Sequence, residues 1–129
     1  MSSESLHEPA EKLSPATIDR HRATVSLMEE LEAIDWYDQR IDAATDEELK
    51  AILRHNRDEE KEHACMVLEW LRRQDPALDQ QLRTYLFKDG DVMAAEAEAE
   101  SHDAEESEGD GSSDGNLGIG DLRGEEVGP

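Results

Sequence analysis

The chain has 129 residues, of which 36% are hydrophobic and 4% aromatic, and its formal net charge is −21. This length allows one small domain with tails, and the low apolar content excludes a large independent core. The acidic charge argues against nucleic acid and against anionic membrane surfaces as partners, and no apolar run approaches the roughly 18 residues of a membrane-spanning helix.

The first helix is predicted after a loose arm formed by residues 1–13. Ser14 followed by Pro15 is typical of an N-cap and a first helical position, and the helix should extend to about Ala43. Glu30 lies on the same face as apolar residues that recur at alternating intervals of four and three. The other members of this stripe are Ala23, Leu27, Ile34, Tyr37 and Ile41.

A second helix is predicted over about residues 46–73, because Thr45 with Glu48 three residues later indicates a capping box. Its stripe alternates in the same way and contains Leu49, Leu53, Asn56, Glu60, His63, Val67 and Trp70. A carboxylate and an imidazole at the centre of an apolar seam are costly unless they are paired or bind a cation.

The chain is expected to reverse between the two helices, at Ala43-Ala44-Thr45-Asp46. Glu30 and Glu60 are equally distant from Thr45, about 22 Å along a helix, and His63 lies one turn beyond Glu60. The three side chains should therefore meet at one point, where a metal ion is the simplest compensation. Two alternatives stay open: a solvated Glu/His face and a structural ion-pair network, although no Arg or Lys occupies either stripe.

A short third helix is predicted after Asp75-Pro76, with Gly90 as its stop, so that residues 14–90 form the helical region. A hairpin of two long helices cannot bury both apolar stripes by itself. The predicted fold is therefore all-α: an antiparallel two-helix hairpin with a short third helix, which dimerises into a four-helix bundle.

The remaining chain divides into two segments. Residues 91–113 are acidic and poor in apolar residues, which predicts a disordered linker, although a marginal helix can be drawn through about residues 92–106. In residues 114–129 aliphatic side chains reappear among glycines, as in a short docking peptide; a frayed tail is the alternative. The expected partner-binding residues are Leu117, Ile119, Leu122 and Arg123.

One chain supplies half of a carboxylate-bridged dinuclear site, and a two-fold dimer would supply four carboxylates and two imidazoles. Such ligands suit iron or manganese. Tyr37 lies two turns from Glu30 and is expected to act near the site. The alternative is that Tyr37 is an aromatic residue of the interface whose hydroxyl is already hydrogen-bonded. Glu29, Glu32 and Trp36 outline a path by which cations reach the site, unless they form an ordinary acidic face.

These features resemble an encapsulated ferritin in the hairpin and in the tail from Leu117 to Gly124. The resemblance implies a ferritin-like half-bundle whose dimers assemble into an open decameric ring. It also implies a ferroxidase that oxidises Fe(II) to Fe(III) with dioxygen at a di-iron site shared by two subunits. The implied ligands are Glu30, Glu60 and His63, with Tyr37 beside them and with Glu29, Glu32 and Trp36 toward the outside.

The same resemblance implies that residues 114–129 dock the protein inside an encapsulin shell, in the bacterial cytoplasm, where the shell stores the oxidised iron. A non-catalytic metal-binding adaptor or scaffold is the alternative function. A peroxidase of the rubrerythrin kind is disfavoured, because the single Cys65 cannot build the cysteine-ligated iron domain of those proteins. A single cysteine also fits a reducing compartment.

Overall fold

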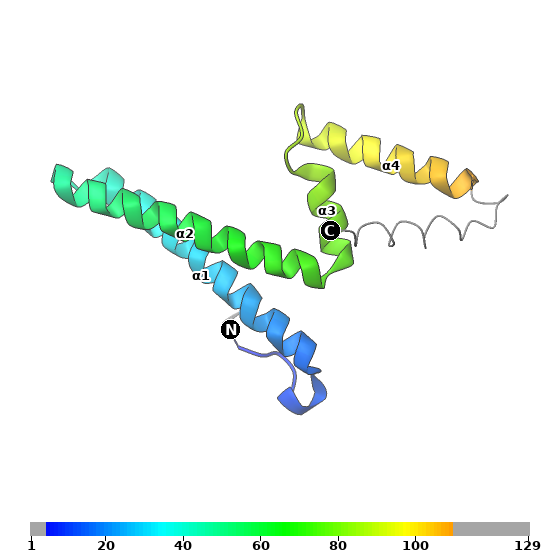
Figure 1. Ribbon diagram of the computed structural model, residues 1–129, viewed down its shortest axis with the longest axis horizontal. Helices are drawn as coiled ribbons and strands as arrows, with labels where there is room; N and C mark the ends of the chain where they lie inside the picture. Colours follow the sequence, from blue (N-terminus) through cyan, green and yellow to red (C-terminus); the bar gives the residue numbers. More distant parts are fainter. Residues whose placement is uncertain (1–4, 110–129) are drawn as a thin grey trace, which may run out of the picture. The chain divides into compact units, whose positions relative to one another are not determined.

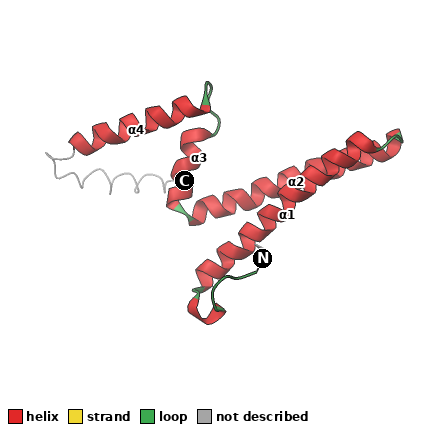
Figure 2. Ribbon diagram, turned by 180° about the vertical axis from the view of Figure 1, so that it is seen from behind, coloured by secondary structure: helices red, strands yellow, loops and turns green. Residues whose placement is uncertain are grey.

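The computed structural model describes residues 5–109, and every regular element in that range is a helix (Figures 1 and 2). The predicted all-α class is therefore confirmed. A 3₁₀ turn, η1, precedes four helices, whose bounds are Ala10–Lys12 for η1, Pro15–Ala43 for α1, Glu47–Gln74 for α2, Pro76–Tyr85 for α3 and Val92–Gly109 for α4. The predicted docking peptide, residues 114–129, lies outside the described residues.

Side-chain caps fix where the two long helices begin. The Ser14 hydroxyl accepts the backbone N–H of Thr17 at 3.1 Å, so the predicted N-cap of α1 is confirmed. The predicted cap of α2 was wrong by one residue: Asp46, not Thr45, is the N-cap, and its carboxylate accepts the N–H of Leu49 at 2.8 Å. A carboxylate is favoured there because it also interacts with the positive end of the helix dipole.

Helices α1 and α2 lie side by side as an antiparallel hairpin (Figures 1 and 2). On α1 the buried residue is Ile41, a member of the predicted stripe. On α2 the buried residues are Ala64 and Leu71. Ala64 follows Glu60 by four residues and Leu71 follows Ala64 by seven, so the three residues share one face of the helix. The packed face of α2 is thus shifted toward Ala64 and Leu71, but it still contains Leu53, Asn56, Glu60 and Val67 of the predicted stripe, which are half-buried. Leu49 and Trp70 of that stripe are 45% and 39% exposed.

The shifted face also contains a cation that the predicted stripe lacked. Arg57 precedes Glu60 by three residues, and its guanidinium reaches Asp38 of α1 at 3.0 Å. No Arg or Lys occupies either predicted stripe, but Arg57 lies beside the α2 stripe on the packed face and forms a structural ion pair there. Glu60, a predicted metal ligand, and this ion pair therefore lie on the same face of α2.

The corner between α2 and α3 is held by side chains at the end of α2. The Asp75 carboxylate accepts the N–H groups of Ala77 and Leu78, at 3.0 and 3.1 Å. Arg72 pairs with Glu69 at 2.7 Å and with Asp79. These contacts join the first turn of α3 to the end of the hairpin.

Helix α3 ends five residues before the predicted stop at Gly90. Phe87 follows the last turn with φ = 59°, a conformation that interrupts a right-handed helix. This stop could not be predicted from the sequence, because the residue that adopts positive φ is aromatic and not glycine or asparagine. No helix among residues 5–109 is long and apolar enough to cross a membrane.

In the acidic segment, predicted as a disordered linker with a marginal helix over about residues 92–106 as the alternative, residues 92–109 form α4. Asp91 caps this helix by accepting the N–H of Ala94 at 3.2 Å. Val92 and Met93 are exposed at its start, so the helix is built from local preference. Alanine and glutamate, which dominate the segment, have high intrinsic helix propensity, and this favours the helical form over the expected disorder.

Candidate metal centre

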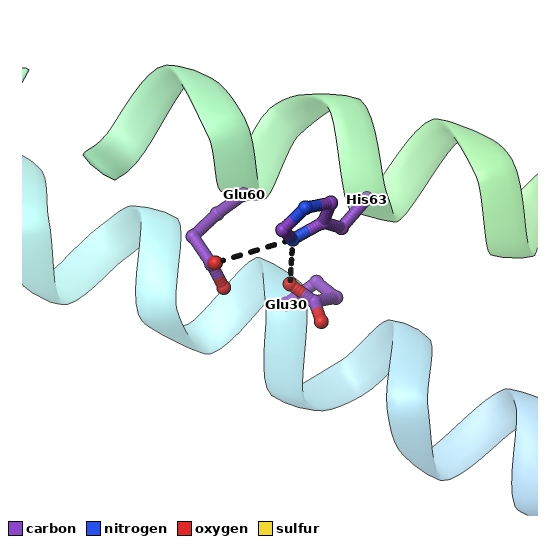
Figure 3. Close-up of side chains that lie close together, drawn as sticks. All are labelled: Glu30, Glu60 and His63. Carbon is purple, nitrogen blue, oxygen red and sulfur yellow. Dashed lines mark ion pairs between the residues drawn. The ribbon is translucent and has the colours of Figure 1, made fainter. Parts of the chain in front are cut away.

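Three ligand-type side chains meet near the middle of the hairpin (Figure 3). Glu30 comes from α1, and Glu60 and His63 come from successive turns of α2. Nδ1 of His63 lies 3.3 Å from Oε1 of Glu60 and 3.7 Å from Oε2 of Glu30. One ligand atom from each residue lies within 4.8 Å of the other two, and no other such group of three occurs within residues 5–109.

The two carboxylates are partly withdrawn from water. The Glu30 and Glu60 side chains are 23% and 25% exposed, and Oε2 of Glu30 is buried without a hydrogen-bond partner in the described part of the chain. The pKa of Glu30 is raised, mainly because a hydrogen bond with the Glu60 carboxyl group favours the protonated form. Burial raises the pKa further because it disfavours the charged form, whereas the nearby charge of His63 lowers it. The environment of Glu30 within one chain therefore disfavours its charged form.

This donor set fits a divalent metal ion. Carboxylate oxygens with one imidazole nitrogen are the ligands of iron and manganese sites, and a bound cation would satisfy the orphaned Oε2 of Glu30. Three protein ligands leave coordination positions open for further groups. Thiolate chemistry is absent from the cluster, since Cys65 is exposed and is not among its members.

The site is open on one side of the hairpin. His63 is 47% exposed, although it lies between two partly buried carboxylates. Positions 49, 52, 56, 59, 63, 66 and 70 of α2 follow one another at intervals of three and four, so they share this face. The large apolar members of that face are exposed: Leu49, Ile52, Met66 and Trp70. An apolar face that surrounds an incomplete ligand set is suited to a protein interface.

The other predicted site residues lie around the cluster but outside it. Tyr37 is half-buried on the same stripe of α1 as Glu30, whereas Glu29 and Glu32 are exposed. Trp36 is 48% exposed. Within one chain Glu29 and Glu32 are not members of the three-ligand group.

Two arginines near the site were not found from the sequence. The guanidinium carbon of Arg40 lies 5.4 Å from the ring centre of Tyr37 and 6.0 Å from that of Trp36. Arg57 pairs with Asp38 across the hairpin. The signal for Arg40 was its spacing of three and four residues from the two rings, and the signal for Arg57 was its position one turn before Glu60.

Replacing Glu30 with glutamine (E30Q) is expected to stabilise the metal-free protein at neutral pH. Because the pKa of Glu30 is raised above its ordinary 4.5, the folded state binds more protons than the unfolded state above pH 4.5. The stability that Glu30 contributes is present below that pH and is lost as the pH rises through the raised pKa. Removing the charge should raise the free energy of unfolding by about 1 kcal/mol, measured by urea unfolding with a chelator present.

The matched control is E62Q, which changes an exposed carboxylate on α2 and should alter stability by less than about 0.5 kcal/mol. Across pH 4.5 to 7.5 the stability of the unmodified protein should fall relative to that of E30Q. If the difference in stability between the unmodified protein and E30Q does not change over this pH range, the pKa of Glu30 is not raised in the folded protein.

The sequence and the fold are both similar to those of known proteins. The family model described as EncFtn-like matches residues 5–89. An encapsulated ferritin-like protein of Rhodospirillum rubrum is 59% identical over 128 residues, which are 96% of this chain and 91% of that protein. An encapsulin nanocompartment cargo protein of Myxococcus xanthus, EncC, is 46% identical over 52 residues, 40% of each chain.

Among solved structures, the crystal structure of a Nitrosomonas europaea protein superposes with a TM-score of 0.67 at 59% sequence identity. The match covers 68% of this chain and 97% of the other. The fold of the matched part of this chain is therefore shared by an experimentally determined structure.

Proposed function

Because this chain belongs to the EncFtn-like family, we propose that it is a ferroxidase that works as the iron-oxidising cargo of an encapsulin nanocompartment. The observation that carries the proposal is the meeting of Glu30, Glu60 and His63, whose ligand atoms lie within 4.8 Å of one another. Fe(II) is the substrate and dioxygen is the oxidant: two Fe(II) ions each lose one electron and leave as Fe(III), while one dioxygen takes up both electrons and two protons and is reduced to the peroxide level.

The complete site requires two chains. One chain offers two carboxylates and one imidazole, which is half of the ligand set of a di-iron carboxylate site in a four-helix bundle. The exposed face with His63, Met66 and Trp70 is the surface through which a second hairpin would complete both the ligand set and the apolar core. By resemblance these dimers assemble into a decameric ring.

Proton release should accompany metal binding. The raised pKa of Glu30 means that the metal-free site favours a proton that a cation must displace. Metal affinity should therefore fall as the pH falls. In the proposed site Tyr37 acts beside the ligands, while Glu29, Glu32 and Trp36 guide cations from the surface, in keeping with the exposure of the two carboxylates.

The proposed domain organisation follows from these roles. Residues 1–13 are an arm, residues 14–90 form the metal-binding half-bundle, and residues 91–113 connect it to a targeting peptide at residues 114–129. Helix α4 lies in the connecting segment. The proposed targeting residues are Leu117, Ile119, Leu122 and Arg123, and the compartment is an encapsulin shell in the bacterial cytoplasm. The Myxococcus relative, whose name describes a cargo protein, supports this partner.

Fe(II) is expected to promote dimer formation. Metal that binds the shared site but not the single chain shifts the equilibrium toward the dimer by mass action. Native mass spectrometry under anaerobic conditions should show dimers and higher even-numbered assemblies that increase with Fe(II), and H63A should lose this response. Monomers at every metal concentration, or an assembly pattern that is the same in H63A, would contradict a shared site.

The competing function is a non-catalytic metal-binding adaptor, in which the same cluster only ties two chains together. Both functions predict metal-dependent assembly, so assembly alone does not separate them. Aerobic addition of Fe(II) does: a ferroxidase consumes dioxygen and produces Fe(III) over many equivalents of iron, whereas an adaptor binds about two ions per dimer and stops.

A further inference from the structure

An ion pair of Arg57 joins the two helices one turn from the ligand cluster. Arg57 of α2 donates from Nη1 to Oδ1 of Asp38 on α1 at 3.0 Å, and from Nε to Oδ1 of Asp58 at 3.1 Å. The Arg57 side chain is only 23% exposed, although it carries a charge. Its position, three residues before Glu60, places it on the packed face of α2, one turn from the ligands.

We propose that Arg57 is a positioning residue, whose ion pair with Asp38 fixes the register of α1 against α2 so that Glu30 meets Glu60 and His63. This inference rests on the metal site proposed above. In an antiparallel hairpin, a slip of one residue moves every facing pair by about 1.5 Å along the axis. Apolar side chains tolerate such a slip, whereas a bonded charge pair on the seam has one preferred register.

The same pair also keeps the guanidinium away from a ligand. Arg57 and Glu60 are three residues apart on one helix, a spacing at which Arg and Glu side chains reach each other. Instead, Asp38 and then Asp58 engage Arg57 and raise its pKa. The Glu60 carboxylate lies beside His63 at 3.3 Å. Without Asp38, Arg57 would be able to neutralise Glu60 and to compete with a metal ion.

Cobalt binding to the full chain tests this role independently of iron oxidation. Co(II) is used anaerobically as the probe, and its visible d–d bands report the geometry of the ligands. D38N is expected to bind Co(II) about tenfold more weakly and with altered bands, as for other supports of metal ligands. The charge-swapped variant D38R/R57D should recover most of the affinity and the original bands.

The matched control is D35N, which removes the same charge from α1 one turn earlier. Asp35 accepts a hydrogen bond from Gln39 at 3.1 Å within α1 and makes no ion pair to α2. Its Co(II) affinity should stay within about twofold of the unmodified protein, as expected for an exposed charge. Circular dichroism checks that each variant is folded.

The outcomes separate positioning from other roles. If D35N and D38N lose Co(II) affinity equally, the loss is an effect of net charge and the proposal is wrong. Unchanged Co(II) affinity and unchanged bands in D38N would also overturn the proposal. A swapped variant that folds but does not recover binding would also overturn it. If E30A binds Co(II) as the unmodified protein does, the metal site itself fails; loss in E30A without loss in D38N rejects only the role of Arg57.

Discussion

Replacing Glu30 or His63 with alanine is expected to lower the initial rate of Fe(II) oxidation by at least about 100-fold. Each substitution removes one ligand from each half of a shared site, so every dimer loses two donors. The loss of Glu30 also removes the only member of the cluster that α1 provides. The rate is followed by Fe(III) absorbance and by dioxygen consumption after aerobic addition of Fe(II).

Matched controls lie on the same helix. His55 and Glu62 are exposed residues of α2, of the same types as the ligands but outside the cluster. H55A and E62A should oxidise Fe(II) within about twofold of the unmodified protein, because exposed charged side chains contribute little to structure. If E30A and H63A are as active as these controls, the catalytic assignment is wrong. If they lose metal-dependent assembly while the unmodified protein shows no turnover, the adaptor function is favoured.

Deleting residues 114–129 is expected to abolish co-purification with an encapsulin shell protein while leaving Fe(II) oxidation unchanged. The deleted segment lies outside the helical region that carries Glu30, Glu60 and His63, and a docking peptide acts through its own few apolar anchors. The measurement is co-expression with the shell protein, isolation of intact shells and quantification of the enclosed chain. Loss should be nearly complete.

A substitution series sharpens this experiment. Changing Leu117, Ile119 and Leu122 together to serine keeps the length and charge of the tail and should reproduce the deletion. Changing Glu125 and Glu126 to glutamine alters the charge but keeps the apolar anchors, so encapsulation should persist. Equal encapsulation of the serine variant and the unmodified protein would place the targeting signal elsewhere in the chain.

The ligand cluster was predictable because the rise per residue of an α-helix is constant. Glu30 and Glu60 are equally distant from the reversal near Thr45, and a fixed rise per residue brings equal distances to equal height. The structure places their carboxylates with His63 in one group. The start of α1 was predictable for a similar reason, since the Ser14 cap is a local contact that depends on residues within one turn.

The acidic segment shows where local preference was misjudged. The prediction weighed the lack of apolar anchors against helix formation, yet residues 92–109 form α4. Alanine and glutamate favour a helix by themselves, and Asp91 supplies its cap. The early end of α3 has a different origin, because a positive φ at Phe87 has no signature in the sequence.

The sequence by itself determined the two long helices, their antiparallel pairing and the height at which Glu30, Glu60 and His63 meet, because each depends on spacing along one chain. Only the tertiary structure decided which face of α2 packs against α1. Two stripes about 100° apart on that helix both carry apolar residues, so the periodicity of the sequence is compatible with either face packing against α1. Packing buries Ala64 and Leu71 and leaves the face of Met66 and Trp70 exposed, and that choice places Arg57 against Asp38.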